Sequence, residues 1–256
     1  MLSDLIMGIS LPFIGTVIGS SSVLFAKNGL NISVQRVLSG FAAGVMVAAS
    51  VWSLLIPAMD YSSDMGAASF FPAVFGFWLG VFCLMFTEKM VTRLNLFGVS
   101  KRNEKAKSTL IMVLAVALHN FPEGMAVGVA YAGLLCGEES IAAAGALALS
   151  IGVAVQNLPE GAVVSLPLRN SGRFRAFGCG VLSGVVEPVG AVLTIALSRL
   201  FIPVLPYFLG FAAGAMMFVV VSELVPETSG DSRSDKGTVF FSLGFSLMMA
   251  LDVAFG

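Results

Sequence analysis

The feature of this sequence that most constrains its fold is a series of apolar stretches, each close to the length of a membrane-spanning helix. Most approach or exceed the roughly 20 residues that a helix needs to cross a bilayer. Only 11% of the residues are charged, against about 25% in a soluble domain. The sequence therefore predicts an all-α integral membrane protein, with eight transmembrane helices in a single polytopic domain of residues 1–256. The predicted spans lie near Leu5–Phe25, Val37–Met59, Phe70–Phe86, Leu110–Leu135, Ile141–Leu168, Ala176–Ser198, Pro203–Val225 and Val239–Ala254.

The basic residues are distributed asymmetrically between the predicted loops. If the N-terminus lies outside, the inner loops hold all but one of the 14 Lys and Arg residues, and only Arg199 falls outside. The loop of residues 89–108 alone carries six of them. An excess of Lys and Arg marks the cytoplasmic side. Both termini are therefore predicted to be extracytoplasmic, in a cell membrane that we expect to be a bacterial inner membrane.

Glycines recur four residues apart in six of the predicted spans. This spacing lets two helix backbones approach closely where lipid provides no hydrophobic drive for association. We therefore interpret most of these pairs as helix-packing contacts. They are Gly15/Gly19, Gly40/Gly44, Gly76/Gly80, Gly124/Gly128, Gly180/Gly184 and Gly210/Gly214.

An internal repeat relates the second and seventh spans. Residues 40–46 read Gly-Phe-Ala-Ala-Gly-Val-Met and residues 210–216 read Gly-Phe-Ala-Ala-Gly-Ala-Met, and a proline follows each, Pro57 and Pro226. The second span runs from inside to outside and the seventh runs in the reverse direction, so the repeat is inverted. Inverted repeats are typical of secondary transporters, whose substrate site lies where the repeats meet.

The fourth and fifth spans carry a second pair of related motifs. Residues 119–124 read His-Asn-Phe-Pro-Glu-Gly and residues 156–161 read Gln-Asn-Leu-Pro-Glu-Gly. In each motif the first polar residue and the glutamate stand four apart, on one face of a helix. The proline frees a backbone carbonyl four residues earlier, and free polar backbone at membrane depth is tolerated only in a protein interior or along a water-filled cavity.

The side chains of these motifs indicate a metal site. The candidate ligands are one imidazole, two carboxylates and three amides, a set that suits zinc, iron, manganese or cobalt better than copper(I). The two glutamates would repel each other if both were ionised in a dry interior, and either a bound divalent ion or protonation removes that repulsion. We therefore expect transport to depend on pH. The candidate ligands are His119, Asn120, Glu123, Gln156, Asn157 and Glu160.

Three further residues are candidates for the metal pathway. Glu187 in the sixth span and Glu223 in the seventh are acids within predicted spans, and an intramembrane acid is a functional hypothesis by default. For Glu223, nearer the inner end and on a proposed exit path, a structural role is an equal alternative. Met46 could offer a thioether from the second span, although most methionines only pack.

At these residues the chain resembles the zinc–iron permease (ZIP) family over essentially its full length. The resemblance implies an eight-helix bundle of the 3+2+3 type and a two-metal site in which Glu123 and Glu160 bridge the ions. It implies that His119, Asn120, Gln156 and Asn157 are ligands, with Glu187 contributing from the sixth span. It further implies a homodimer that carries divalent metal, zinc first and also iron, manganese, cobalt or cadmium, into the cytoplasm. Spans one, four, five and six would slide against the other four, as in an elevator.

The sequence departs from many ZIP members at three places: Asn157 stands where a carboxylate or histidine is common, Ser222 where some have histidine, and the loop of residues 89–108 lacks a histidine cluster. The alternative is a calcium or cation–proton exchanger with paired Asn and Pro-Glu repeats, but calcium prefers six to eight oxygens and no imidazole. The sequence also lacks HExxH, GxGD and GxSG, the motifs of an intramembrane protease. We therefore expect a transporter rather than an enzyme, with metal ions and lipid as partners, no nucleic acid and no prosthetic group.

Overall fold

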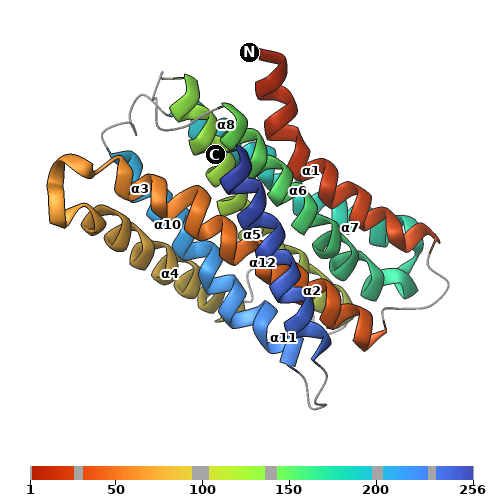
Figure 1. Ribbon diagram of the computed structural model, residues 1–256. Coiled ribbons are helices and arrows are strands. Elements are labelled where there is room, and N and C mark those ends of the chain that lie inside the picture. The colour runs from red at the N-terminus through yellow and green to blue at the C-terminus, as the bar shows by residue number, and fades with distance from the viewer. Residues whose placement is uncertain are drawn as a thin grey trace.

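A computed structural model describes residues 2–25, 31–93, 104–135, 143–197, 204–229 and 235–255. Nearly all of these residues are helical, and none of them forms a strand (Figure 1). The elements are α1 (Leu2–Phe25), α2 (Ile32–Ala49), η1 (Ser50–Leu55), α3 (Ile56–Asp60), η2 (Ser63–Ala68), α4 (Phe70–Arg93), α5 (Glu104–Leu135), α6 (Ala143–Ser165), η3 (Leu166–Ser171), α7 (Arg173–Gly184), α8 (Val186–Ala196), α10 (Leu205–Val219), η5 (Val220–Leu224), α11 (Val225–Ser229) and α12 (Lys236–Phe255).

The described residues include 7 helices that are long and apolar enough to cross a membrane. They correspond to all the predicted spans except the one at Leu110–Leu135, which lies within the 32-residue helix α5. The chain is thus an all-α, multi-pass membrane protein, and the total of eight spans stays a prediction. Half of the predicted inner loop at 89–108, residues 94–103, lies outside the described residues, as does Arg199.

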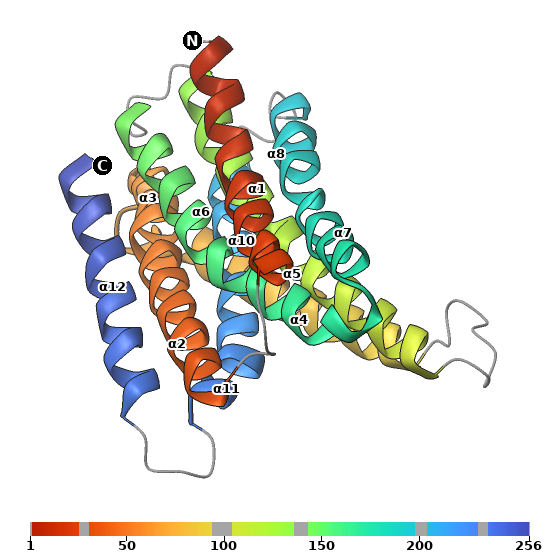
Figure 2. The same cartoon turned by 90° about the vertical axis from the view of Figure 1, so that its right-hand side faces the viewer.

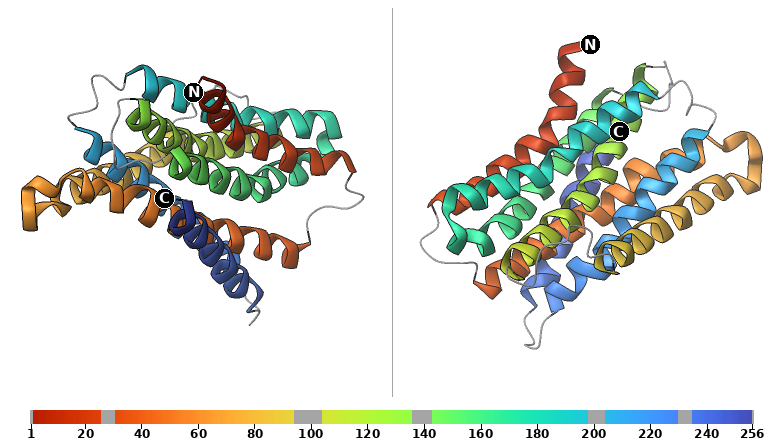
Figure 3. Two further views of the ribbon diagram at one scale, coloured as in Figure 1. Left: turned by 45° about the horizontal axis from the view of Figure 1, so that its top comes forward. Right: turned by 180° about the vertical axis from the view of Figure 1, so that it is seen from behind.

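The helices divide into two groups. Helix α1 packs against α6 and α7, and α5 packs against α8. In the other group, α2 packs against α12, and α4 packs against α10. The right-hand view of Figure 3 shows α1, α7 and α8 on one side of the bundle, and α2, α4 and α10 on the other. The groups meet where α6 contacts α2 and α12, and where α5 contacts α10.

The glycine pairs lie where two helices approach most closely, as the spacing predicts. A Cβ atom on Gly40 or Gly44 would collide with the backbone of α12. Gly76 and Gly80 meet the backbone of α10 in the same way, and the corresponding glycines of α10 meet α4. The pairs in α1 and α5 face the backbones of α6 and α8, and the pair in α7 faces side chains of α1. These contacts hold each group together without bulky side chains.

The two halves of the inverted repeat share a local distortion of the helix. In each, a π-helical segment begins four residues after the shared methionine: η1 starts at Ser50 after Met46, and η5 starts at Val220 after Met216. A proline follows each segment, Pro57 in α3 and Pro226 in α11. Such π segments are rare and frequently occur at functional sites. The repeat seen in the sequence therefore extends to the backbone conformation.

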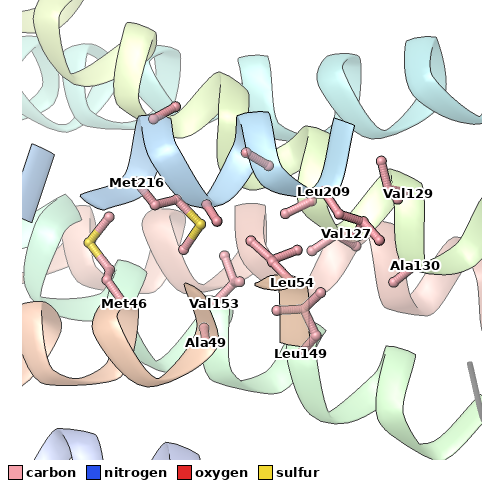
Figure 4. Close-up of a cluster of buried hydrophobic side chains, with 14 of the residues drawn as sticks. Met46, Ala49, Leu54, Val127, Val129, Ala130, Leu149, Val153, Leu209 and Met216 are labelled. Carbon is pink, nitrogen blue, oxygen red and sulfur yellow. The ribbon is translucent and has the colours of Figure 1, made fainter. Parts of the chain in front are cut away.

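A cluster of buried apolar side chains fills the space between the two groups. Figure 4 shows Met46, Leu54 and Met216 of one group together with Val127 and Val153 of the other. Many remaining members are alanines from α2, α5, α6 and α10. Small side chains make the surface between the two groups smooth.

Candidate metal centre

The paired motifs of the fourth and fifth spans lie on α5 and α6, which pack against each other. Both helices continue through their prolines, Pro122 and Pro159. Helix α8 reaches α5 because Gly124 has no side chain, and a Cβ atom there would collide with the backbone carbonyl of Glu187. The sixth span turns at Val185, between α7 and α8, and Glu187 follows in the first turn of α8. Three spans therefore meet at the motifs.

Two groups of hydrogen-bonded side chains lie at this meeting point. In the first, Nε2 of Gln156 donates to Oε1 of Glu123 over 2.7 Å. In the second, Nδ2 of Asn120 donates to Oε1 of Glu187 over 3.0 Å and to the backbone carbonyl of Ser183 over 3.1 Å. All five residues are buried. Each amide nitrogen is thus held by an acceptor of the protein, and this fixes which end of the amide carries the oxygen.

Helix α1 supplies the remaining wall of the site, which the sequence analysis did not anticipate. Nδ2 of Asn157 donates to the backbone carbonyl of Pro12 over 3.3 Å. The hydroxyl of Thr16 donates to Oε1 of Glu187 over 2.7 Å. Close packing of α1 on α6 brings these groups together, because Gly15 and Gly19 lie directly against the backbone of α6. Thr16 carries no local sequence signal of a site, and Pro12, a proline inside a predicted span, was not used as one.

Five buried oxygen atoms in this region accept no hydrogen bond from the described residues. They are Oδ1 of Asn120, Oε2 of Glu123, Oε1 of Gln156, Oδ1 of Asn157 and Oε2 of Glu187. A buried acceptor without a partner costs about 1–3 kcal/mol, and such atoms are rare in native proteins. A cation that binds these oxygens removes the cost. The residues present therefore fit a metal ion whose ligands include carboxylate and amide oxygens.

Glu160 lies one turn beyond Gln156 on α6 and is only partly buried. It lines a cavity of about 60 Å³ together with Glu223 of η5 and Glu227 of α11. Arg36 lies three residues before Ser39, another residue of this lining, so the cavity faces the end of the bundle that carries basic residues. The charge of Glu160 also acts on Glu123 and Glu187. Glu160 therefore lines the cavity from the same helix that carries Gln156.

Two of the predicted ligands are not seen in this network. Met46 packs in the apolar cluster between the two groups (Figure 4), which accounts for its burial, and its role as a ligand stays a prediction. The side chain of His119 lies outside the described residues, although its backbone belongs to α5. Among the side chains that the structure describes, no three His, Cys, Asp or Glu residues come together as a metal cluster. The two-metal site likewise stays a prediction.

Two carboxylates were missed by the sequence analysis. Glu227 accepts hydrogen bonds from Ser39 over 2.5 Å and from Gln35 over 3.4 Å, which ties α11 to α2 beside the cavity. Asp252 is buried in α12 and accepts a hydrogen bond from Ser53 over 2.5 Å. An acid inside an apolar span is a functional hypothesis by default, so the position of Asp252 in the eighth predicted span was a signal that could have been used. Glu227 follows Pro226 at the end of a span and gave no such signal.

Comparison with known proteins identifies the family of the chain. The family model described as "ZIP Zinc transporter" matches residues 99–252. The human zinc transporter ZIP11 is 33% identical, and the match covers 94% of each chain. The zinc transporter ZIPB of Bordetella bronchiseptica is 35% identical over 98% of this chain and 81% of its own.

A third relative, the zinc transporter ZupT of Corynebacterium glutamicum, is 34% identical over 82% of this chain and 83% of its own. The relatives thus come from animals and bacteria, and the matches cover most of each chain. They favour a metal transporter of the ZIP type over a calcium or cation–proton exchanger. The chain therefore belongs to the ZIP zinc transporter family, whose members are membrane transporters and not enzymes.

Proposed function

We propose that this protein carries zinc, and with it other divalent transition metals, across the membrane into the cytoplasm through the site between α5, α6 and α8. The observation that carries the proposal is the set of five buried oxygens without a hydrogen-bond donor, one each from Asn120, Glu123, Gln156, Asn157 and Glu187. An ion that leaves water must recover its hydration energy from such ligands. The imidazole of His119, in the same turn of α5 as Asn120, would add a nitrogen ligand. Iron, manganese, cobalt and cadmium are included because ligand type and geometry decide selectivity more than raw affinity does.

The proposed path of the ion runs from the site toward the end of the bundle that carries basic residues. Glu160 is the step between the buried oxygens and the cavity that it lines with Glu223 and Glu227. A cavity of about 60 Å³ is large enough to hold water. The ion would regain water there while carboxylates still offset its charge. Glu223, predicted as an exit residue, is placed to serve in this step.

The grouping of the helices supports an elevator-type movement. The ligand helices α5, α6 and α8 belong to the group with α1 and α7, and the facing group of α2, α4, α10 and α12 supplies none of the five oxygens. Because the buried cluster between the groups is apolar and rich in alanine, the small side chains there offer little resistance to sliding of one group against the other. We also propose a homodimer, which the mass of the particle in a lipid nanodisc tests directly.

The number of ions held by the site is predicted to depend on Asn157. With Glu123, Glu160 and Glu187 ionised and the amides neutral, the local charge is about −3, which offsets one divalent ion and falls short for two. One position should therefore be tight and the other weak at micromolar metal. Asn157→Asp should fill the second position and shift the preference among zinc, iron, cobalt and manganese. In the metal-free variant the new carboxylate would face the carbonyl of Pro12, so bound metal also removes that repulsion.

This prediction is measured by metal stoichiometry, using native mass spectrometry or anomalous scattering, with competition uptake in proteoliposomes. Wild type and Asn157→Asp are compared across zinc, iron, cobalt, manganese, cadmium and calcium. Two equally tight ions in the wild type, with no change in the variant, would show that the charge argument is wrong. Uptake of calcium alone would contradict the proposed cargo.

The proposed orientation places both termini outside the cell, in a bacterial inner membrane. Figures 1 and 2 show the two termini at the same end of the bundle, which supports an even number of crossings. In a variant without native cysteines, Ser63→Cys should react with a membrane-impermeant thiol reagent from outside. Ser100→Cys should react only after the membrane is opened. Equal labelling of both sites in intact cells would overturn this topology.

A further inference from the structure

Helix α1 carries a buried hydroxyl group that touches the proposed site without belonging to either sequence motif. Thr16 is 1% exposed, and its Oγ1 lies 2.7 Å from Oε1 of Glu187. Gly184 makes this contact possible, because a Cβ atom there would stand 2.7 Å from Cγ2 of Thr16 and 3.1 Å from the same glutamate oxygen. The hydroxyl thus occupies space that the sixth span leaves open.

The hydrogen bond of Thr16 departs from the usual behaviour of a helical threonine. Buried Ser and Thr side chains in helices commonly donate to the carbonyl four residues earlier, as Thr194 does to Gly190 over 2.8 Å. Thr16 lies 3.4 Å from the corresponding carbonyl, that of Pro12. Its shorter contact is with Glu187. The hydroxyl is therefore directed at the carboxylate and not at its own helix.

The consequence for Glu187 is that its two oxygens have different partners. Oε1 accepts hydrogen bonds from Thr16 and from Asn120. Oε2 has no donor among the described residues and is left for another ligand. Two donors from different helices, α1 and α5, fix the orientation of the carboxylate. A ligand that is held in its binding geometry in advance loses less entropy when the ion arrives.

We propose that Thr16 is a positioning residue of the metal site: it holds Glu187 by one oxygen so that the other coordinates the transported ion. This inference rests on the proposed function. The hydroxyl does not touch the ion, so its removal should weaken metal binding while the translocation step continues. The effect should appear in the KM for zinc uptake and much less in the maximal rate.

The test compares Thr16→Val, which has the same shape without the hydroxyl, with Thr16→Ser, which keeps the hydroxyl. Hydrogen bonds to charged groups contribute enough that losing one changes affinity by about tenfold. We expect Thr16→Val to raise the KM for zinc about tenfold with a maximal rate within about twofold of wild type, and Thr16→Ser to restore the wild-type KM. The matched control is Thr194→Val, a buried threonine of α8 that donates only within its own helix. It should leave the KM unchanged.

Zinc uptake into proteoliposomes is measured together with thermal unfolding without metal, which separates loss of fold from loss of affinity. If Thr16→Val does not fold, Thr16→Ala removes the hydroxyl without placing a methyl group against the carboxylate, and the same rise in KM is expected. A wild-type KM in the folded variant, or the same rise in Thr16→Ser, would overturn the positioning role. If Glu123→Gln loses uptake but Thr16→Val keeps the wild-type KM, the positioning role of Thr16 is rejected and the proposed site is retained. Normal uptake in Glu123→Gln would reject the site itself.

Discussion

Replacing Glu123 by glutamine should reduce zinc uptake by about a hundredfold or more, while the protein still inserts and folds. Glu123 is fully buried, and its Oε1 accepts the hydrogen bond from Gln156 while its Oε2 faces no donor among the described residues. Glutamine keeps the volume and the acceptor for Gln156, but it places an amide group where the charge of the ion needs a carboxylate. Removing one partner of a buried charge pair costs about 3–5 kcal/mol, and each 1.4 kcal/mol is about a factor of ten.

The measurement is uptake of radioactive zinc into proteoliposomes at equal protein abundance. Glu160→Ala should lose uptake in the same way, because its carboxylate lies on the proposed path of the ion through the cavity that it lines. Gln156→Ala should weaken uptake without abolishing it, since a neutral amide contributes less than a carboxylate. Asp235→Asn, at an exposed acid just before α12, is the control and should transport normally. Wild-type uptake in Glu123→Gln at equal abundance would rule out the proposed site.

A covalent link between α6 and α12 should stop transport completely and reversibly. Gly152 of α6 faces Met248 of α12, and a Cβ atom on Gly152 would collide with the sulfur of that methionine. The two residues belong to different groups of helices, so an elevator movement must separate them. In a variant without native cysteines, Gly152→Cys with Met248→Cys should therefore lose uptake in proportion to the cross-linked fraction. A reducing agent should restore the uptake.

The matched control is a cross-link within one group. Gly180 of α7 faces the side chain of Ser20 of α1, and both helices belong to the group that carries the ligands. Gly180→Cys with Ser20→Cys should transport equally well before and after cross-linking, because these helices move together. Full uptake in the cross-linked α6–α12 variant would contradict sliding of the two groups, although the metal site could still be correct.

The sequence was sufficient to predict the class of fold and most of the candidate site. The spans could be recognised because a bilayer imposes a length and a polarity on every helix that crosses it, and both can be read along the chain. The same cost makes an acid within a span conspicuous, which identified Glu123, Glu160 and Glu187. Glycines at four-residue spacing predicted close helix contacts, and the structure confirms them in all six pairs.

Other features depended on contacts between residues far apart in the chain, and only the tertiary structure decided them. Thr16 and Glu187 are 171 positions apart, and Asn157 and Pro12 are 145 apart. Nothing along the chain indicates that Pro12, a proline inside a span, or Thr16, a small residue, lies beside these distant side chains. Which oxygen of each carboxylate and amide stays without a donor follows from these partners, because a side chain has a fixed number of acceptor positions. The sequence alone therefore indicated which residues are candidate metal ligands, whereas the packing of α1, α5, α6 and α8 decided which of their oxygen atoms have no hydrogen-bond donor among the described residues.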